Sequence, residues 1–478
     1  MKDIIDQLSK LEKISRQLEI PANERTAFLK KAGDYANAFI QGLDHSKAFE
    51  EVHHPSGFLA IDENKKSIDQ ILQLYQSEVA TKGIIAASGG QMGYIPGGGI
   101  YMAAIADFIA AATNPYAGVY YASPGAATIE NEVLAWLKSI FSFPKTAAGN
   151  LASGGSTATL IALTAARDKH HIKNERIPTS VVYVSEQVHH STQKTLRLIG
   201  LEDAMVRYVP LDDNHRIKAD ILEELIVKDK SQGLNPFLVV ATAGTTDTGA
   251  IDPLESIAEI TDRHKLWFHA DAAYGGFFIL TPKKILFKGI EKADSLVVDP
   301  HKGMFLPYGL GAVLIRDKQV ALRSNRYTAN YMQDVLDEDL ADSPANVSPE
   351  LTKHFRGLRL WLPLQIHGIE PFVACLEEKL LLTLYFREKL VEFGFRVGPE
   401  PDLSISYFWY PFDGDTNEKN KKLMQAIHRD GSVFLSSSII NKQFVIRMAI
   451  LSFRTRRSTV DKALEMIVRC LKAVNSGV

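Results

Sequence analysis

Residues 295–302 have the sequence Ser-Leu-Val-Val-Asp-Pro-His-Lys, and a second apolar run follows at residues 311–315. Short apolar runs between polar or turn residues predict buried strands. A lysine placed between two buried strands is unusual, because burying an ammonium group costs several kcal/mol unless the charge is paired or neutralised. Lys302 is therefore either a surface lysine at the end of a strand or a member of a functional site.

The chain around this stretch alternates short apolar runs with helix-like segments. The predicted strands are Val181–Val184, Phe237–Ala243, Leu266–His269, Leu296–Val298 and Ala312–Ile315. Helix-like segments at 219–227 and 254–263 lie between the earlier runs. This rhythm predicts an α/β fold with a largely parallel sheet covered by helices on both faces.

Polar side chains follow four of these predicted strands. His189 comes after the first run, Thr246 after the second, Asp271 after the third, and Lys302 after the fourth. Ligands bind to open parallel sheets beyond the carboxyl ends of the strands. We therefore expect these side chains to share one edge of the sheet.

A glycine-bearing turn leads into a helix at residues 152–167, Ala-Ser-Gly-Gly-Ser-Thr-Ala-Thr-Leu-Ile-Ala-Leu-Thr-Ala-Ala-Arg. Gly154 and Gly155 allow a ligand to approach the backbone, and Ser156 or Thr157 can cap the helix. The free N–H groups and the dipole of a helix N-terminus favour an anion. A capped helix without any ligand is the alternative. The glycine-rich stretch 88–99 has no nucleotide-binding pattern and predicts a tight turn with close backbone approach.

Composition limits the function classes. The 478 residues carry a net charge of −2, with 46% hydrophobic and 23% charged residues, which predicts a globular protein with no general attraction to nucleic acid or anionic membranes. Two cysteines exclude a disulfide framework or a Cys/His zinc spacing, so no metal is expected. Neither a signal peptide nor a run of about 20 apolar residues is seen, which predicts a cytoplasmic protein.

Three parts are expected along the chain: an N-terminal helical arm at 1–85, a large domain at 86–370 and a small C-terminal domain at 371–478. The arm does not close a core by itself and needs a partner surface, either the large domain or a second subunit. The polar stretch 326–348, which contains Tyr327 and Tyr331, predicts a mobile loop that covers a site.

These residues together supply what pyridoxal 5′-phosphate needs from a protein. The cofactor requires an amine for its aldehyde, a carboxylate for its pyridine nitrogen, an anion site for its phosphate and a surface against its ring. Lys302 is the candidate Schiff-base lysine, Asp271 the carboxylate, and the turn at 153–157 the anion site. His189 can stack on the ring, with Ala273 as a small neighbour. Individually, each of these residues also has an ordinary structural interpretation.

Five segments carry a resemblance to a known family. They are SGGSTATL (153–160), SEQVHHS (185–191), AGTT (243–246), HADAAYGG (269–276) and DPHK (299–302). They resemble the group II pyridoxal-phosphate decarboxylases, and the resemblance spans about residues 88 to 457. It implies the type I (aspartate aminotransferase) fold, with a mostly parallel seven-stranded sheet and a small C-terminal α+β domain. It also implies a homodimer with active sites at the subunit interface.

The same resemblance implies a role for each site residue. Lys302 holds the cofactor covalently, Asp271 pairs with the pyridine nitrogen, and His189 and Ala273 face the ring. The phosphate is held by Gly154, Gly155 and Ser156 with help from His301, and Thr246 lies close to the cofactor. Tyr331 returns a proton to the substrate carbon after carbon dioxide leaves, and Tyr327 is the second candidate for this role.

The implied reaction is decarboxylation of an L-amino acid, with aromatic amino acids as the first candidates. Acidic amino acids are an alternative substrate class, and a carbon–carbon lyase of the sphingosine-phosphate lyase type is an alternative reaction. A cofactor-bound protein without activity and a nucleotide-binding protein are weaker interpretations. Because relatives that form aldehydes carry phenylalanine in place of the tyrosine, Tyr331 favours simple decarboxylation.

The chain departs from the animal aromatic enzymes at three places. Asp299 stands where they often have asparagine, Gly303 follows the lysine where they have tryptophan, and a Trp-His pair is missing near residues 86–87. The aromatic substrate pocket therefore cannot be transferred, although Tyr94, Tyr120 and Tyr121 are candidates to line one. For Arg356 and Arg447, binding a carboxylate and a structural role are held as equal alternatives.

Overall fold

The computed structural model describes residues 1–478 except 53–58, 62–64, 326–342 and 477–478. Its centre is a seven-stranded sheet in the order β3-β9-β8-β7-β6-β4-β5. The strands are β3 (Ala148–Ala152), β4 (Ser180–Val184), β5 (Met205–Tyr208), β6 (Asn235–Thr242), β7 (Trp267–Asp271), β8 (Ser295–Val298) and β9 (Gly311–Ile315). Only β9 runs against its neighbours, so the predicted mostly parallel sheet is confirmed.

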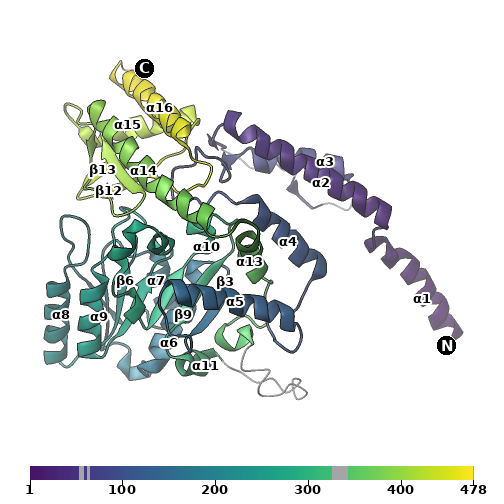
Figure 1. The fold of residues 1–478 in the computed structure, drawn as a ribbon, viewed down its shortest axis with the longest axis horizontal. Helices are drawn as coiled ribbons and strands as arrows, with labels where there is room; N and C mark the ends of the chain where they lie inside the picture. Colours follow the sequence, from purple (N-terminus) through teal and green to yellow (C-terminus); the bar gives the residue numbers. More distant parts are fainter. Residues whose placement is uncertain (53–58, 62–64, 326–342, 477–478) are drawn as a thin grey trace.

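Helices cover both faces of the sheet (Figure 1). One face packs on α5 (Pro124–Ile140), α8 (Ala219–Ser231) and α9 (Leu254–His264), and the other on α6 (Gly155–Lys169), α7 (His190–Leu198) and α11 (Lys318–Asn325). Successive residues of a strand alternate between these two cores, as Val239 and Val240 do on β6. Both faces are apolar because both are buried, which explains the continuous apolar runs in the sequence.

All five apolar runs form strands, but β3 and β5 were not predicted. Strand β3 contains Gly149 and Asn150, and β5 is a partly exposed edge strand that contains Arg207, so neither has an apolar run. The expected helix at 152–167 begins at Gly155, because Ala152 pairs with Gly311 as the last residue of β3.

A second, smaller sheet has four antiparallel strands in the order β10-β11-β13-β12. Its strands are β10 (Arg396–Val397), β11 (Ile405–Trp409), β12 (Ser436–Ile440) and β13 (Gln443–Ala449), and it packs on α15 (Thr416–Asp430) and α16 (Arg457–Asn475). The long helix α14 (Glu370–Glu392) joins this part to the large sheet. Phe372 and Leu376 pack in the core between the large sheet and α5, α8 and α9, whereas Leu382 and Phe386 pack in the core of the four-stranded sheet with α15 and α16.

The N-terminal residues form helices α1 (Lys2–Ser15), α2 (Ala22–Gly42) and α3 (Ile68–Tyr75). Figure 1 shows α1 and α2 extending away from the body of the molecule. Neither of these two helices contains a buried residue. Among the described residues, no helix is both long enough and apolar enough to cross a bilayer.

A fully buried ion pair fixes the segment that leads into α13 (Gly357–His367). Lys353 Nζ lies 2.8 Å from Glu130 Oε2 and also donates to the Leu151 carbonyl at 3.0 Å, and neither charged side chain is exposed. Glu130 Oε1 accepts the backbone N–H groups of Arg356 and Gly357 at the start of the helix. One carboxylate thus holds a cation and a helix N-terminus to α5.

We expect Glu130→Leu to lower the free energy of unfolding by about 3–5 kcal/mol, because it leaves the Lys353 ammonium buried without its partner. Glu130→Leu combined with Lys353→Met should recover part of the loss, since no charge is then buried. Urea unfolding at pH 7 measures the effect. Asp34→Ala, which breaks an exposed ion pair with Lys30, is the control and should leave the urea concentration at the unfolding midpoint unchanged. Equal stability of Glu130→Leu and the wild type would contradict this account.

Candidate active site

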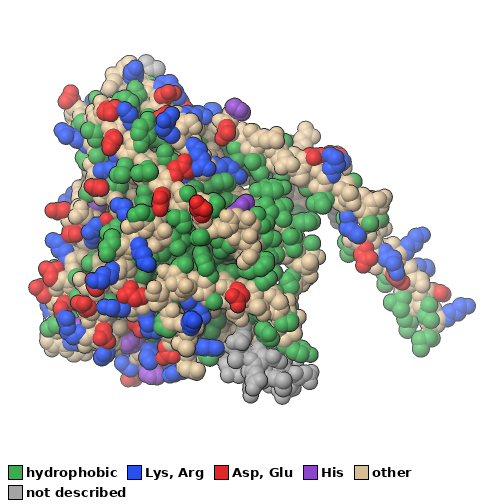
Figure 2. All heavy atoms as spheres, in the orientation of Figure 1, with side chains coloured by type: hydrophobic (Ala, Val, Ile, Leu, Met, Phe, Trp, Pro, Cys, Tyr) green, Lys and Arg blue, Asp and Glu red, His purple; other side chains and the backbone are tan. Residues whose placement is uncertain are grey.

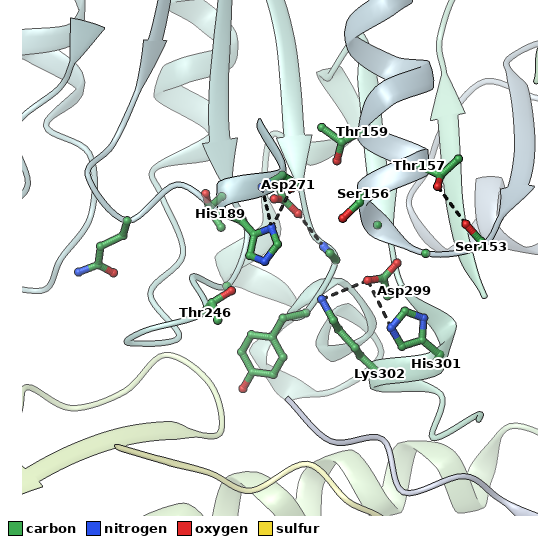
Figure 3. Close-up of a pocket in the computed structure, with 18 residues that line it drawn as sticks. Ser153, Ser156, Thr157, Thr159, His189, Thr246, Asp271, Asp299, His301 and Lys302 are labelled. Carbon is green, nitrogen blue, oxygen red and sulfur yellow. Dashed lines mark hydrogen bonds and ion pairs between the residues drawn. The ribbon is translucent and has the colours of Figure 1, made fainter. Parts of the chain in front are cut away.

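A cavity of about 300 Å³ lies at the carboxyl ends of the parallel strands, and Figure 3 shows the residues that line it. Of the predicted site residues within the described part of the chain, all line this cavity: Gly154, Gly155, Ser156, His189, Thr246, Asp271, Ala273, His301 and Lys302. Tyr331 and Tyr327 lie outside the described residues. The geometry thus brings together residues that are up to 148 positions apart, from Gly154 to Lys302.

Lys302 is placed by the short helix α10 (Pro300–Gly303), which begins directly after β8. Its ammonium lies 3.1 Å from Asp299 Oδ2, and 19% of its side chain is exposed, which leaves the amine accessible from the cavity. The glycine-rich stretch packs on the back of this helix: a Cβ added at Gly97 would lie 2.1 Å from the His301 carbonyl oxygen. The predicted close approach of this backbone is therefore present.

Asp271 is the last residue of β7 rather than a residue after it. The β7–β8 register pairs Asp271 with Val297, so its carboxylate lies beside the strand that leads to Lys302. Oδ1 accepts the backbone N–H of Ala273 at 3.1 Å, and the residue is 6% exposed. The turn after β7 therefore holds the carboxylate facing into the cavity (Figure 3).

Helix α6 points its N-terminus at the cavity. Gly154 is the N-cap and offers no side-chain cap, so the predicted cap by Ser156 or Thr157 is wrong. The first bond of the helix runs from the Ala158 N–H to the Gly154 carbonyl, which leaves earlier N–H groups available for an anion. The Thr157 hydroxyl instead bonds the Ser153 hydroxyl at 2.9 Å.

His189 caps α7, because its Nδ1 accepts the Ser191 N–H at 3.2 Å. Nδ1 therefore carries no proton, and in the neutral ring the proton lies on Nε2. His301 has the opposite arrangement, since its Nδ1 lies 2.6 Å from the Leu310 carbonyl and must donate to it. Burial lowers the pKa of both imidazoles, so both rings are neutral at pH 7.

The departure at Gly303 has a structural explanation, and the candidate pocket tyrosines can be placed relative to the cavity. A Cβ added at Gly303 would lie 2.8 Å from the Cβ of Phe277, so the backbone after Lys302 has no room for a bulky side chain. Tyr94, Tyr120 and Tyr121 do not line the described cavity. They therefore give no support to an aromatic pocket within this part of the chain.

The two candidate arginines already have protein partners. Arg356 makes a bidentate pair with Glu350, at 2.8 Å on both sides. Arg447 is 3% exposed and donates to the Asp247, Thr246 and Tyr94 carbonyls and to the Ser436 hydroxyl. It joins the loop after β6 to β12, and these contacts favour the structural alternative for both residues.

Several residues that line the cavity were not predicted from the sequence. These are Thr159, Gln187, Ser191, Thr242, Gly244 and Tyr274, whereas Ser153 and Thr157 belong to the turn predicted as the anion site. Thr242 could have been found, because it ends β6 as Asp271 ends β7 and the two residues pair in register. Asp299 was recognised as a polar residue after the fourth predicted strand and as a departure from the family pattern, but its pairing with Lys302 was not predicted.

The residues present fit pyridoxal 5′-phosphate. An accessible amine, a carboxylate and an uncapped helix N-terminus face one cavity, which are the groups that the cofactor requires. One oxygen of Asp299, Oδ1, is buried without a hydrogen-bond partner in the described residues. A buried acceptor of this kind indicates a missing donor.

The comparisons agree with this geometry. The family model "Pyridoxal-dependent decarboxylase conserved domain" matches residues 58–410. An aromatic-L-amino-acid decarboxylase of Bacillus atrophaeus is 34% identical over 79% of this chain and 79% of its own length. An L-2,4-diaminobutyrate decarboxylase of Acinetobacter baumannii is 33% identical over 59% of each chain. The crystal structure of Oryza sativa TDC with PLP and tryptamine, 23% identical, superposes with a TM-score of 0.87 and covers 95% of this chain and 98% of that one.

A histidine beneath the site makes stability depend on pH. His269 is fully buried two residues before Asp271, and its Nδ1 lies 2.8 Å from the Ser295 hydroxyl. Burial lowers the pKa of His269 to about 4, whereas the unfolded chain takes up this proton near pH 6.5. The unfolded state therefore gains protons first as the pH falls, and the folded state loses stability in this range.

We expect protonation of His269 in the unfolded state to lower the free energy of unfolding by about 3 kcal/mol as the pH falls from 6.5 to 4. Urea unfolding of the wild type and His269→Asn at several pH values measures it, and the wild type should lose more stability on acidification. His170, whose pKa burial also lowers to about 4, is present in both proteins and does not affect the difference. Parallel stability curves for the two proteins would show that His269 is not responsible.

Proposed function

The chain belongs to the pyridoxal-dependent decarboxylase family, and on that premise we propose that it removes the carboxylate of an L-amino acid with pyridoxal 5′-phosphate as cofactor. The observation that carries the proposal is the convergence of Lys302, Asp271 and the N-terminus of α6 on one cavity. Aromatic amino acids are the first candidates, supported by the 34% identical aromatic-L-amino-acid decarboxylase.

Each described residue has a role in this proposal. Lys302 would hold the cofactor covalently, Asp271 would keep its pyridine nitrogen protonated, and the α6 N-terminus with Ser156 and His301 would bind its phosphate. His189 and Ala273 would face its ring. When bound, the cofactor accepts the electrons left behind when the carboxylate departs.

The chain's own groups determine where protons lie. The Asp271 carboxylate lies beside the end of β8, and the Ala273 N–H holds it in place. His189 and His301 stay neutral because burial lowers the pKa of each, so Lys302 is the one cationic side chain among the described residues that line the cavity. Tyr331 is proposed to donate the proton to the substrate α-carbon, with Tyr327 as the alternative. Both tyrosines lie outside the described residues.

Two alternatives keep the cofactor: one changes the class of amino acid that is the substrate, and the other changes which bond of the substrate is broken. A decarboxylase for another class of amino acid is supported by the diaminobutyrate decarboxylase at 33% identity and by the departures at Gly303 and Asp299. Acidic substrates belong to the same alternative. A carbon–carbon lyase of the sphingosine-phosphate lyase type has no specific support among the described contacts.

The proposal is tested by measuring carbon dioxide release from each proteinogenic L-amino acid and from L-2,4-diaminobutyrate. We expect release from at least one of them, and none from Lys302→Ala, which lacks the amine. Borohydride should attach the cofactor permanently to the wild type and to Lys284→Ala, an exposed-lysine control, but not to Lys302→Ala. A covalent adduct in Lys302→Ala would remove Lys302 from this role.

We further propose that the chain forms a homodimer through its N-terminal arm. Helix α1 carries the apolar residues Ile4, Leu8, Leu11 and Ile14 at helical spacing, and each is 57–64% exposed. On the body, α4 (Tyr101–Thr113) exposes Tyr101, Phe108 and Ile109, and Figure 2 shows hydrophobic side chains gathered over this region. Contiguous exposed apolar patches of this kind mark interaction surfaces. The cytoplasmic location stays a prediction.

Adding a charge to the apolar face of α1 tests the dimer. Leu8→Asp combined with Leu11→Asp should shift the protein toward monomer, because a carboxylate cannot be buried unpaired in an apolar interface. Light scattering after size exclusion gives the mass. Ser9→Asp, which adds a charge away from this face, should leave the dimer intact. A wild type that is monomeric at micromolar concentration would refute the proposal.

A further inference from the structure

Lys379 lies on α14, does not line the cavity, and has a fully buried side chain. Its Nζ donates to the Thr455 carbonyl at 2.6 Å and lies 2.9 Å from Oε2 of Glu378, a partly exposed carboxylate that also pairs with Arg456. Burying an ammonium group is unfavourable even when it is paired, and an apolar side chain of similar volume often gives equal or greater stability. Stability alone therefore does not account for a lysine at this position.

The segment that Lys379 holds, residues 452–455, also binds the glycine-rich stretch 88–99. Three of its donors reach carbonyl oxygens of that stretch. They are the Phe453 N–H to Gly97 at 3.4 Å, Arg454 Nη1 to Gly98 at 2.6 Å and the Thr455 hydroxyl to Gly89 at 2.7 Å. The packing is as close as the hydrogen bonding, since a Cβ added at Gly89 would lie 2.6 Å from the Arg454 carbonyl oxygen. The segment is therefore fixed to both ends of the stretch.

The glycine-rich stretch in turn lies against α10, the helix of four residues that carries Lys302. A Cβ added at Gly97 would lie 2.1 Å from the His301 carbonyl oxygen and 3.2 Å from that of Lys302, so the two backbones meet directly. The Ile100 N–H donates to the Phe305 carbonyl at 2.8 Å, just beyond the helix. A single helical turn has little stability of its own, because helix nucleation is unfavourable. The position of α10 therefore depends on the backbone that packs on it.

We propose that Lys379 is a positioning residue for Lys302, acting on it through the intervening backbone. Lys379 fixes the Thr455 carbonyl and with it the segment 452–455, and this segment holds the glycine-rich stretch against α10. The Lys302 amine thereby keeps its place at the cavity. The inference rests on the proposed function, in which Lys302 holds the cofactor, and it gives a role in cofactor binding to a residue that does not line the cavity.

Hydrogen exchange read by mass spectrometry tests these contacts on the full-length protein before cofactor is added. Lys379→Met keeps the length of the side chain and removes its donors, and Glu378 retains Arg456 as a partner. Exchange should become about tenfold faster in peptides that cover 88–99 and 300–305, because losing a buried hydrogen bond from a charged group eases local opening.

Thr383→Val is the matched control for a buried substitution on the same helix. Thr383 is fully buried one turn after Lys379, and its hydroxyl donates to the Lys379 carbonyl within α14. Exchange at 88–99 and 300–305 should equal that of the wild type. Equal exchange at 300–305 in Lys379→Met and the wild type refutes the proposal. If Lys379→Met does not fold, Thr455→Val, which removes the hydroxyl bonded to Gly89, decides in the same way.

Cofactor affinity is the second measurement. Lys379→Met and Thr455→Val should each raise the Kd of pyridoxal 5′-phosphate about tenfold, and the double variant should raise it no further, because both act through one segment. Thr383→Val should leave this Kd unchanged. Additive effects of the two substitutions contradict the proposal. A wild type that binds no pyridoxal phosphate would instead refute the proposed function, and the exchange result would stand.

Discussion

The parallel pairing of β7 with β8 is the constraint on which the site depends. Their register places Asp271 opposite Val297, two residues before Asp299 and five before Lys302. Because both strands run in the same direction, a carboxylate and an amine that lie 31 residues apart in sequence reach the same edge of the sheet. The antiparallel strand β9 then closes the other side of β8 and brings Gly311 against Asp299.

Much of this arrangement could be predicted from sequence because burial leaves a strong pattern. Strands covered on both faces must be apolar throughout, so the five central strands were recognised. The edge strand β5, with Arg207, and β3, with Asn150, carry no such pattern. Lys302 and Asp271 were found because each follows or ends an apolar run and lies in a specific motif. Their positions beside one cavity agree with that prediction, whereas their roles remain proposals.

The contacts that sequence reasoning missed are those between distant segments. Lys353 and Glu130 are 223 residues apart, and nothing local marks either residue as buried. The same holds for Arg447, whose partners are backbone carbonyls of the loop at Thr246–Asp247 and of Tyr94. The pairing of Asp299 with Lys302 is local, yet its importance depends on Gly155 and Gly311, which only the folded chain brings close.

The glycines around the cavity have a consequence for how this protein can change. At Gly97 and Gly311 an added methyl group would meet backbone atoms at 2.1 and 2.5 Å, and at Gly155 and Gly303 it would meet the side chains of Asp299 and Phe277 at 2.8 Å. The segments at the cofactor end of the cavity are therefore too closely packed to accept a larger side chain at these positions. Substitutions there move the backbone that carries Lys302 and the α6 N-terminus. New substrate preferences must therefore evolve through the remaining walls, and the cofactor end will stay fixed while they diverge.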